Sequence, residues 1–251
     1  MRERPIRVLP VIGPQKEAQR IWEKLLELGA VVEDRENSEY ILVLGGDGTF
    51  LGAERDYYKM QVPFVGFGFG TLNFLLNQKF SSAEDILNIL QRGQWEECCV
   101  FGIKAKIETD NGTEECIAFN DVYIKSTDPT SSAHVQVSAK ECPDSGLVVS
   151  GDGVIIATPQ GSTAYNRNAG GTILPLNSSL WCLTGICDTR KLHVTIDKQE
   201  IRLNNERGEL VVVGDNQKFF GMKRARVFPS KYEVKILFAL GENFEKRRYN
   251  L

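Results

Sequence analysis

Five residues from Gly45 to Thr49, with the sequence GGDGT, are the first candidates for chemistry in this chain. They directly follow an apolar run, 40–44, that is typical of a buried strand. Glycines let the backbone approach a phosphate closely, and the N-terminus of a following helix attracts the same anion. The carboxylate of Asp47 could hold Mg²⁺, or accept a proton from a hydroxyl group that attacks a phosphoryl group. An ordinary turn, in which Asp47 bonds nearby amides, explains the motif equally well.

A second glycine-rich turn, with Gly68 and Gly70, follows the apolar run 62–68. It lacks the fingerprint of dinucleotide-binding folds, and the chain has no Walker A loop. Ligands of open parallel sheets bind beyond the carboxyl ends of the strands. We therefore expect both turns to lie close together as a phosphate-donor loop, made of Gly45, Gly46, Gly48, Thr49, Gly68 and Gly70.

Two stretches of the second half also carry polar residues in unusual places. Asn120 and Asp121 stand in the middle of the strand-like segment 114–126, where they are costly to bury without partners. Such a pair could bind a ribose diol, but spacing alone favours a pair at a hairpin edge that faces water. In the run 151–171, Asp152 precedes an apolar strand, and Tyr165 offers a flat face for stacking on a base. A solvent-exposed loop before a capped helix is the simpler reading of this run.

The apolar spacing predicts how these residues are positioned. Strands at 6–12, 40–44 and 62–68 alternate with helices at 14–30, 49–60 and 81–95, which indicates a parallel sheet with crossover helices. After Trp95 the pattern becomes strand-rich, with a hairpin signal at Asn111-Gly112 and a possible helix after Gly161. The strands expected there are 98–109, 114–126, 133–139, 146–158, 191–197, 200–205, 208–217 and 232–239.

These elements predict a Rossmann-like α/β N-terminal domain, residues 1–96, that carries the phosphate-donor and catalytic site, and an all-β-rich domain, residues 97–229. We expect residues 230–251 to return to the first domain, although the sequence alone leaves this open. The net charge of −3 gives no reason to expect nucleic-acid binding. No stretch reaches the roughly 18 apolar residues that span a membrane, and no signal peptide is visible, so a cytoplasmic location is expected. The six cysteines lack metal-site spacing and are expected to be reduced core residues, with no metal site.

Taken together, GGDGT, FND and GDGVIIATPQGSTAYNRNAGG resemble the NAD kinases, enzymes that phosphorylate the 2′-hydroxyl of the adenosine ribose of NAD. GGDGT is shared with lipid kinases and approximately with phosphofructokinases, whereas Thr-Pro-x-Gly-Ser-Thr-Ala-Tyr is far more specific. The matching positions span most of the chain and are 45–49, 74–75, 120–121, 152–153 and 158–165.

The resemblance implies a role for each matching residue. Asp47 looks like the general base and, with Gly48, would line the NAD site. Asn120 and Asp121 would hold the adenosine ribose, and Asp152 would lie near the other nucleoside. The other residues implied to contact NAD are Phe74, His134, Thr163, Ala164, Tyr165, Asn166, Asn168 and Gln217.

The implied function is phosphorylation of NAD by ATP to give NADP, with Mg²⁺ or another divalent cation as cofactor. The resemblance also implies a homotetramer or homodimer, built through the β-rich NAD-binding domain. Asn73, Ser150 and Gln160 depart from the family pattern, and Asn73 would narrow the donor loop. Two alternatives stay open: a lipid or sugar kinase that shares GGDGT, and a sensor that binds NAD(P) without turnover.

Overall fold

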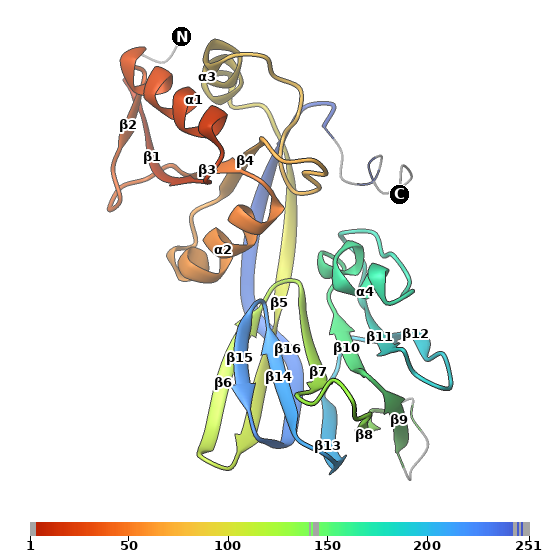
Figure 1. The fold of residues 1–251 in the computed structure, drawn as a ribbon. Helices are drawn as coiled ribbons and strands as arrows, with labels where there is room; N and C mark the ends of the chain where they lie inside the picture. Colours follow the sequence, from red (N-terminus) through yellow and green to blue (C-terminus); the bar gives the residue numbers. More distant parts are fainter. Residues whose placement is uncertain (1–3, 141, 143–145, 243–244, 246, 248–251) are drawn as a thin grey trace. The chain divides into compact units, whose positions relative to one another are not determined.

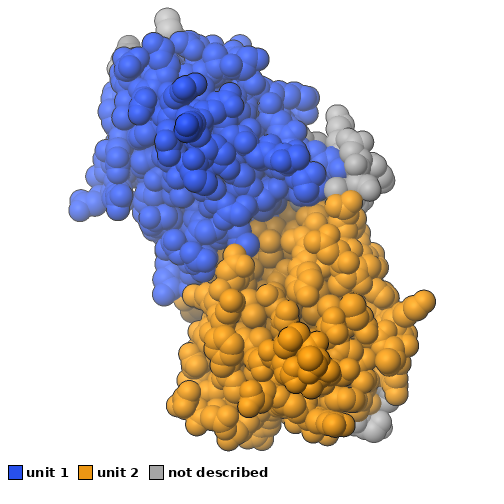
Figure 2. Space-filling model, in the orientation of Figure 1, with its two compact units in different colours: residues 1–100, 233–251 blue, residues 101–232 orange. Residues whose placement is uncertain are grey.

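The computed structural model describes residues 4–140, 142, 146–242, 245 and 247. The chain divides into two compact units (Figure 2): unit 1 comprises Met1–Val100 and Glu233–Leu251, and unit 2 comprises Phe101–Tyr232. Within the described ranges, no helix has both the length and the apolar character needed to cross a membrane.

Unit 1 is built on a parallel sheet (Figure 1). Its strands, in spatial order, are β2 (Val31–Glu33), β1 (Ile6–Ile12), β3 (Tyr40–Gly45) and β4 (Phe64–Gly68). The end of β16 (Met222–Ala239) pairs in parallel with β4 through Ile236 and Phe64. The predicted parallel sheet is therefore confirmed, and the C-terminal strand adds to it.

Helices cover both faces of this sheet (Figure 1): α1 (Lys16–Glu27) and α3 (Ala83–Arg92) lie on one face and α2 (Asp47–Tyr57) on the other. Leu25 of α1 and Ile86 of α3 share one buried cluster with alternate residues of β3 and β4. Phe50 of α2 lies instead against Phe64, with ring centroids 5.9 Å apart. Helix α2 begins two residues earlier than predicted, and its last predicted turn is a 3-10 helix, η1 (Tyr58–Met60).

Unit 2 is built from antiparallel strands that enclose one large apolar core. One sheet has the strand order β12-β11-β10-β7-β14-β15. The other strands of this unit pair in the order β16-β13-β8-β9, and β5 pairs with both β16 and β6. Two short helices, η2 (Gly161–Thr163) and α4 (Tyr165–Asn168), follow β10. The strands are β5 (Trp95–Thr109), β6 (Gly112–Ala118), β7 (Asp121–Ser126), β8 (Ala133–Ser138), β9 (Leu147–Gly151), β10 (Gly153–Ala157), β11 (Leu180–Ile186), β12 (His193–Asp197), β13 (Ile201–Arg207), β14 (Leu210–Gly214) and β15 (Gln217–Phe220).

The hairpin predicted at Asn111-Gly112 is confirmed, because β5 and β6 pair through Thr109 and Gly112. Two of the predicted strands are wrong. Segment 114–126 is not one strand, because β6 ends at Ala118 and β7 begins at Asp121. The Asn120-Asp121 pair therefore lies where one strand has ended and the next begins. Segment 146–158 is likewise two strands, β9 and β10, which belong to different sheets. Strands β2, β11 and β15 were not predicted.

Candidate active site

Asp47 is the first residue of α2, directly beyond the end of β3. Its Oδ2 accepts a hydrogen bond from the Phe74 N–H at 2.9 Å, and its Oδ1 accepts one from the Leu75 N–H at 2.9 Å. Burial raises the pKa of Asp47, while the two amides and the charge of Arg247 act in the opposite direction. Both oxygens are thus fixed in direction, and each keeps a lone pair for a further partner.

The two glycine-rich turns meet beside this carboxylate. A Cβ on Gly45 would lie 2.7 Å from Oγ1 of Thr49, and one on Gly70 would lie 3.4 Å from Cα of Gly46. Such spacing leaves no room for a side chain at Gly45. A Cβ on Gly48, by contrast, would have nothing within 4 Å, so the backbone there borders open space. The predicted phosphate-donor residues of unit 1 therefore do come together.

The Asn73 side chain lies inside the second glycine-rich turn and binds its backbone. Its Oδ1 accepts the Gly70 N–H at 3.0 Å, and its Nδ2 donates to the Gly70 carbonyl at 2.6 Å. A Cβ on Gly68 would lie 2.6 Å from the Asn73 side chain, so Gly68 must lack one. Asn73 has a φ of 51°, a left-handed conformation that asparagine tolerates better than most residues. The departure from the family pattern at this position is therefore accommodated by the fold.

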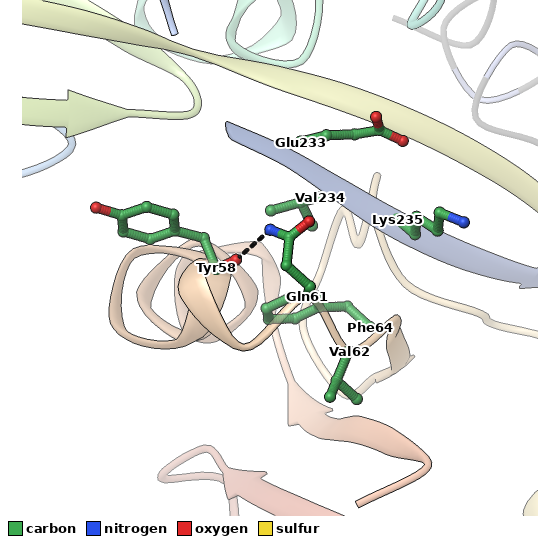
Figure 3. A pocket seen from close by; sticks show the side chains of 7 residues that line it. All are labelled: Tyr58, Gln61, Val62, Phe64, Glu233, Val234 and Lys235. Carbon is green, nitrogen blue, oxygen red and sulfur yellow. Dashed lines mark hydrogen bonds between the residues drawn. The ribbon is translucent and has the colours of Figure 1, made fainter. Parts of the chain in front are cut away.

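A pocket elsewhere in unit 1 contains none of the predicted site residues. Figure 3 shows it between η1, the start of β4 and the unit 1 part of β16, with the Gln61 side chain donating to the Tyr58 carbonyl at 2.9 Å. Its lining residues are Tyr58, Gln61, Val62, Phe64, Glu233, Val234 and Lys235. It is not part of the candidate site.

In unit 2, the Asn120-Asp121 pair is held by Asp215, which the sequence analysis did not select. The N–H groups of Phe119, Asn120 and Asp121 all donate to the Asp215 carboxylate, the last two to Oδ1 at 3.0 and 3.3 Å. Asp215 and Asn216, with φ values of 42° and 72°, form the two-residue turn between β14 and β15. This interaction explains why the backbone leaves the strand at residues 119–120.

Asp121 is 6% exposed, so the favoured prediction of a pair that faces water is wrong for its side chain. Burial, and then the nearby charge of Asp215, raise the pKa of Asp121 to about 8. Within the described part of the chain, no donor reaches the Asp121 carboxyl within hydrogen-bonding distance. The group is therefore suited to carry a proton at neutral pH.

Aromatic and acidic side chains gather around Tyr165. We call Asp121, Tyr123, Asp152, Tyr165 and Cys187 the Tyr165 cluster. The rings of Tyr123 and Tyr165 pack edge to face at 4.9 Å. Burial, followed by the charges of Asp152, Cys187 and Asp121, raises the pKa of Tyr165. A hydrogen bond to Asp152 raises the pKa of the Cys187 thiol. The structure thus brings together three predicted site residues: Asp121, Asp152 and Tyr165.

The segment after β10 is tied to the backbone of Asn120. The Thr158 hydroxyl donates to the Phe119 carbonyl at 2.6 Å, and Gln160 Nε2 donates to Asn120 Oδ1 at 3.2 Å. A Cβ on Gly161 would lie 2.0 Å from the Asn120 carbonyl oxygen, so only glycine fits there. Gln160, the second departure from the family pattern, thus supports a predicted site residue.

Asn166 is fully buried, and its amide donates to the carbonyls of Ser162 and Thr172 and accepts from the Thr184 hydroxyl. Its side chain therefore holds the segment together. A short helix, α4, does begin at Tyr165, after Ala164. The hydroxyls of Ser162 and Thr163 donate to preceding carbonyls and do not cap it, so the predicted side-chain cap is wrong.

The remaining predicted residues are placed as follows. His134 of β8 pairs with Ser150 of β9, the third departure from the family pattern. Asn168, at the end of α4, and Gln217, at the start of β15, are exposed. Among the residues that the structure describes, no side-chain hydrogen bond or ion pair joins His134, Asn168 or Gln217 to the Tyr165 cluster. Phe74 is buried in unit 1, and Ala164 separates η2 from α4.

The chain matches the model of the ATP-NAD kinase N-terminal domain over residues 11–94 and that of the C-terminal domain over residues 119–238. The chain belongs to the ATP-NAD kinase family. It is 33% identical over 226 residues to the NAD kinase of Rickettsia bellii, which covers 85% of each chain. It is also 33% identical over 224 residues to that of Rickettsia typhi, 84% of each chain.

Two solved structures share the fold of the family. Yeast NADH kinase complexed with NADH matches with a TM-score of 0.81 and 18% identity, over 99% of this chain and 87% of that chain. An NAD kinase from Archaeoglobus fulgidus in complex with ATP matches with a TM-score of 0.71 and 22% identity, over 98% and 97%. The predicted family and two-domain fold class are confirmed. Membership of the ATP-NAD kinase family makes the chain an enzyme that phosphorylates NAD, and a lipid or sugar kinase is not favoured.

Proposed function

We propose that the chain transfers the γ-phosphoryl group of ATP to the 2′-hydroxyl of the adenosine ribose of NAD, with Asp47 as the general base. The geometry of Asp47 carries this proposal: a carboxylate with both oxygens oriented by backbone N–H groups, beside glycine turns that approach each other closely. A base held in this way can accept the hydroxyl proton as the oxygen attacks phosphorus.

The glycine turns of unit 1 suit the phosphate donor. Phosphoryl transfer depends mainly on positioning and on neutralising charge, rather than on reactive side chains. The N–H groups at the start of α2 point toward an anion placed beside Gly46 and Gly48, and the helix dipole favours negative charge there. We propose that ATP binds here through Gly45, Gly46, Gly48, Thr49, Gly68 and Gly70.

The residues present fit a divalent cation that arrives with ATP. Mg²⁺ keeps several waters and binds through one or two carboxylates together with substrate phosphates. Asp47 stands at the glycine turns with a lone pair left on each oxygen. The cation would neutralise charge on the transferred phosphoryl group.

We propose that the Tyr165 cluster, with Asn120, binds the dinucleotide. Tyr165 offers a ring face for a base, and a protonated Asp121 can donate to a ribose oxygen as well as accept. Asn120, oriented by Gln160, supplies an amide beside it. Thr163, Ala164, Asn168, His134 and Gln217 remain predicted contacts, as do Phe74 and Asn166. A homodimer or homotetramer built through unit 2 and a cytoplasmic location also remain predictions.

The test is Asp47→Asn, with Asp56→Asn on the exposed side of the same helix as the matched control. We expect kcat to fall about 10²–10⁴-fold, because the amide cannot accept the proton. The KM for NAD should change little. Formation of NADP would be read through an NADP-specific dehydrogenase, with NAD or NADH and with ATP or polyphosphate. Near-full turnover by Asp47→Asn would show that another group is the base.

A further inference from the structure

The side chain of Arg247 binds the loop that follows the second glycine turn in unit 1. Its Nη1 lies 2.8, 2.8 and 2.5 Å from the carbonyl oxygens of Asn73, Phe74 and Leu76. Its Nη2 pairs with the carboxylate of Glu242, which is 4% exposed. A single guanidinium thus binds three backbone carbonyl groups within residues 73–76 and one buried carboxylate. This is a large number of contacts for a residue that the motifs do not include.

The peptide groups bound by Arg247 are the same ones that hold Asp47. The Asn73 carbonyl and the Phe74 N–H belong to one peptide group, and the Phe74 carbonyl and the Leu75 N–H belong to the next. Arg247 binds the oxygen end of each group, while Asp47 accepts from the nitrogen end. Because a peptide group is planar, fixing its oxygen fixes the direction of its N–H.

Glu242 secures the other end of the same loop. Its Oε1 accepts the N–H groups of Gln78 and Lys79 at 2.9 and 2.6 Å. The Arg247–Glu242 pair therefore joins residues 73–76 to residues 78–79. Hydrogen bonds in such a chain polarise one another, which strengthens the N–H groups that face Asp47.

We propose that Arg247 is a positioning residue for phosphoryl transfer, which fixes the two peptide groups that orient the Asp47 carboxylate. This inference rests on the proposed role of Asp47 as the base. It gives the C-terminal residues a function in the site, since Arg247 acts on Asp47 through the backbone and needs no contact with either substrate.

The main test is the double variant Arg247→Met, Glu242→Gln, which avoids leaving a buried carboxylate without its cation. Arg35→Met, which removes an exposed arginine of unit 1, is the matched control. We expect kcat to fall about 10- to 100-fold, because the base is displaced. The KM values for ATP and NAD should change less than about 3-fold, since no substrate contact is lost.

Arg247→Lys is the second variant, because it keeps the charge and disturbs the fold least. A single ammonium cannot bind the three carbonyls and Glu242 together, so we expect kcat to stay low while the KM values stay near those of the wild type. If both Arg247 variants keep the kcat of Arg35→Met, while Asp47→Asn loses turnover, this inference is wrong and the proposed function stands. A lower melting temperature alone, with unchanged kcat, would also overturn it. Near-full turnover by Asp47→Asn would instead remove the proposed function.

Discussion

Asp121→Asn would show whether unit 2 keeps a neutral carboxyl group in its core at physiological pH. Burial and the charge of Asp215 raise the pKa of Asp121 from 3.8 to about 8. Between these values the folded chain holds a proton that the unfolded chain has released. Each pH unit in this window therefore lowers the free energy of unfolding by about 1.4 kcal/mol. Asparagine stays neutral at every pH, so the variant should lack this loss.

The expected difference is large enough to measure directly. From pH 5 to pH 7, the stability of Asp121→Asn relative to the wild type should rise by about 3 kcal/mol. Urea unfolding at pH 5, 6, 7 and 8, followed by tryptophan fluorescence, measures it. The exposed Asp197→Asn in β12 serves as the matched control.

A difference between Asp121→Asn and the wild type that stays constant from pH 5 to pH 8 would refute the reasoning. So would a ¹³C titration of the Asp121 carboxyl carbon that gave a pKa near 4. Either result would mean that water or a donor reaches this carboxylate and stabilises its charged form.

Three further substitutions test the backbone that supports the site. Asp215→Ala removes the acceptor of three backbone N–H groups and should lower the free energy of unfolding by about 3–6 kcal/mol. A loss under about 1 kcal/mol would mean that water replaces the carboxylate. Gly45→Ala places a Cβ 2.7 Å from the Thr49 hydroxyl oxygen and should lower the free energy of unfolding by about 1–3 kcal/mol. In Gly52→Ala the new Cβ has nothing within 4 Å, so this substitution should stabilise α2 by about 0.5–1 kcal/mol. Thermal unfolding compares the two glycine variants, and equal effects would contradict the proposed crowding at Gly45.

Elements with strong local signals were predictable from sequence. Helix α3 has an apolar face, the capping side chain of Ser82 and a left-handed Gly93 at its end, all visible as residue types. The strands that were missed have weaker signals. Strand β2 has three residues, and β15 is mostly exposed, so its pairing depends on the hairpin turn before it. Strand β11 is buried along nearly its whole length and shows no alternation that would mark it as a strand.

Of the candidate site, only the sequence motifs could be predicted, and not the residues that hold them in place. The types and spacing of residues 45–49 and 158–165 indicated which acids and glycines matter. The groups that hold them come from distant parts of the chain: Asp215 lies 94–96 residues from the amides it accepts, and Arg247 lies 173 residues from Phe74. Only the Asp-Asn dipeptide of the turn after β14 could have pointed to Asp215, because such pairs favour two-residue hairpins.

Of the two acidic residues at the centre of the proposal, Asp121 is buried and Asp47 is partly buried, and their surroundings differ. Asp47 receives N–H donors on both oxygens and lies near a guanidinium, which favour its charged form. Asp121 lies near a second carboxylate, which opposes its charged form. Burial raises the pKa of both carboxyl groups, so the two sites differ in whether the neighbouring groups oppose that rise, as at Asp47, or add to it, as at Asp121. Asp47, with both oxygens directed by N–H groups, is suited to accept a proton, whereas Asp121 is suited to carry one and to act as a hydrogen-bond donor.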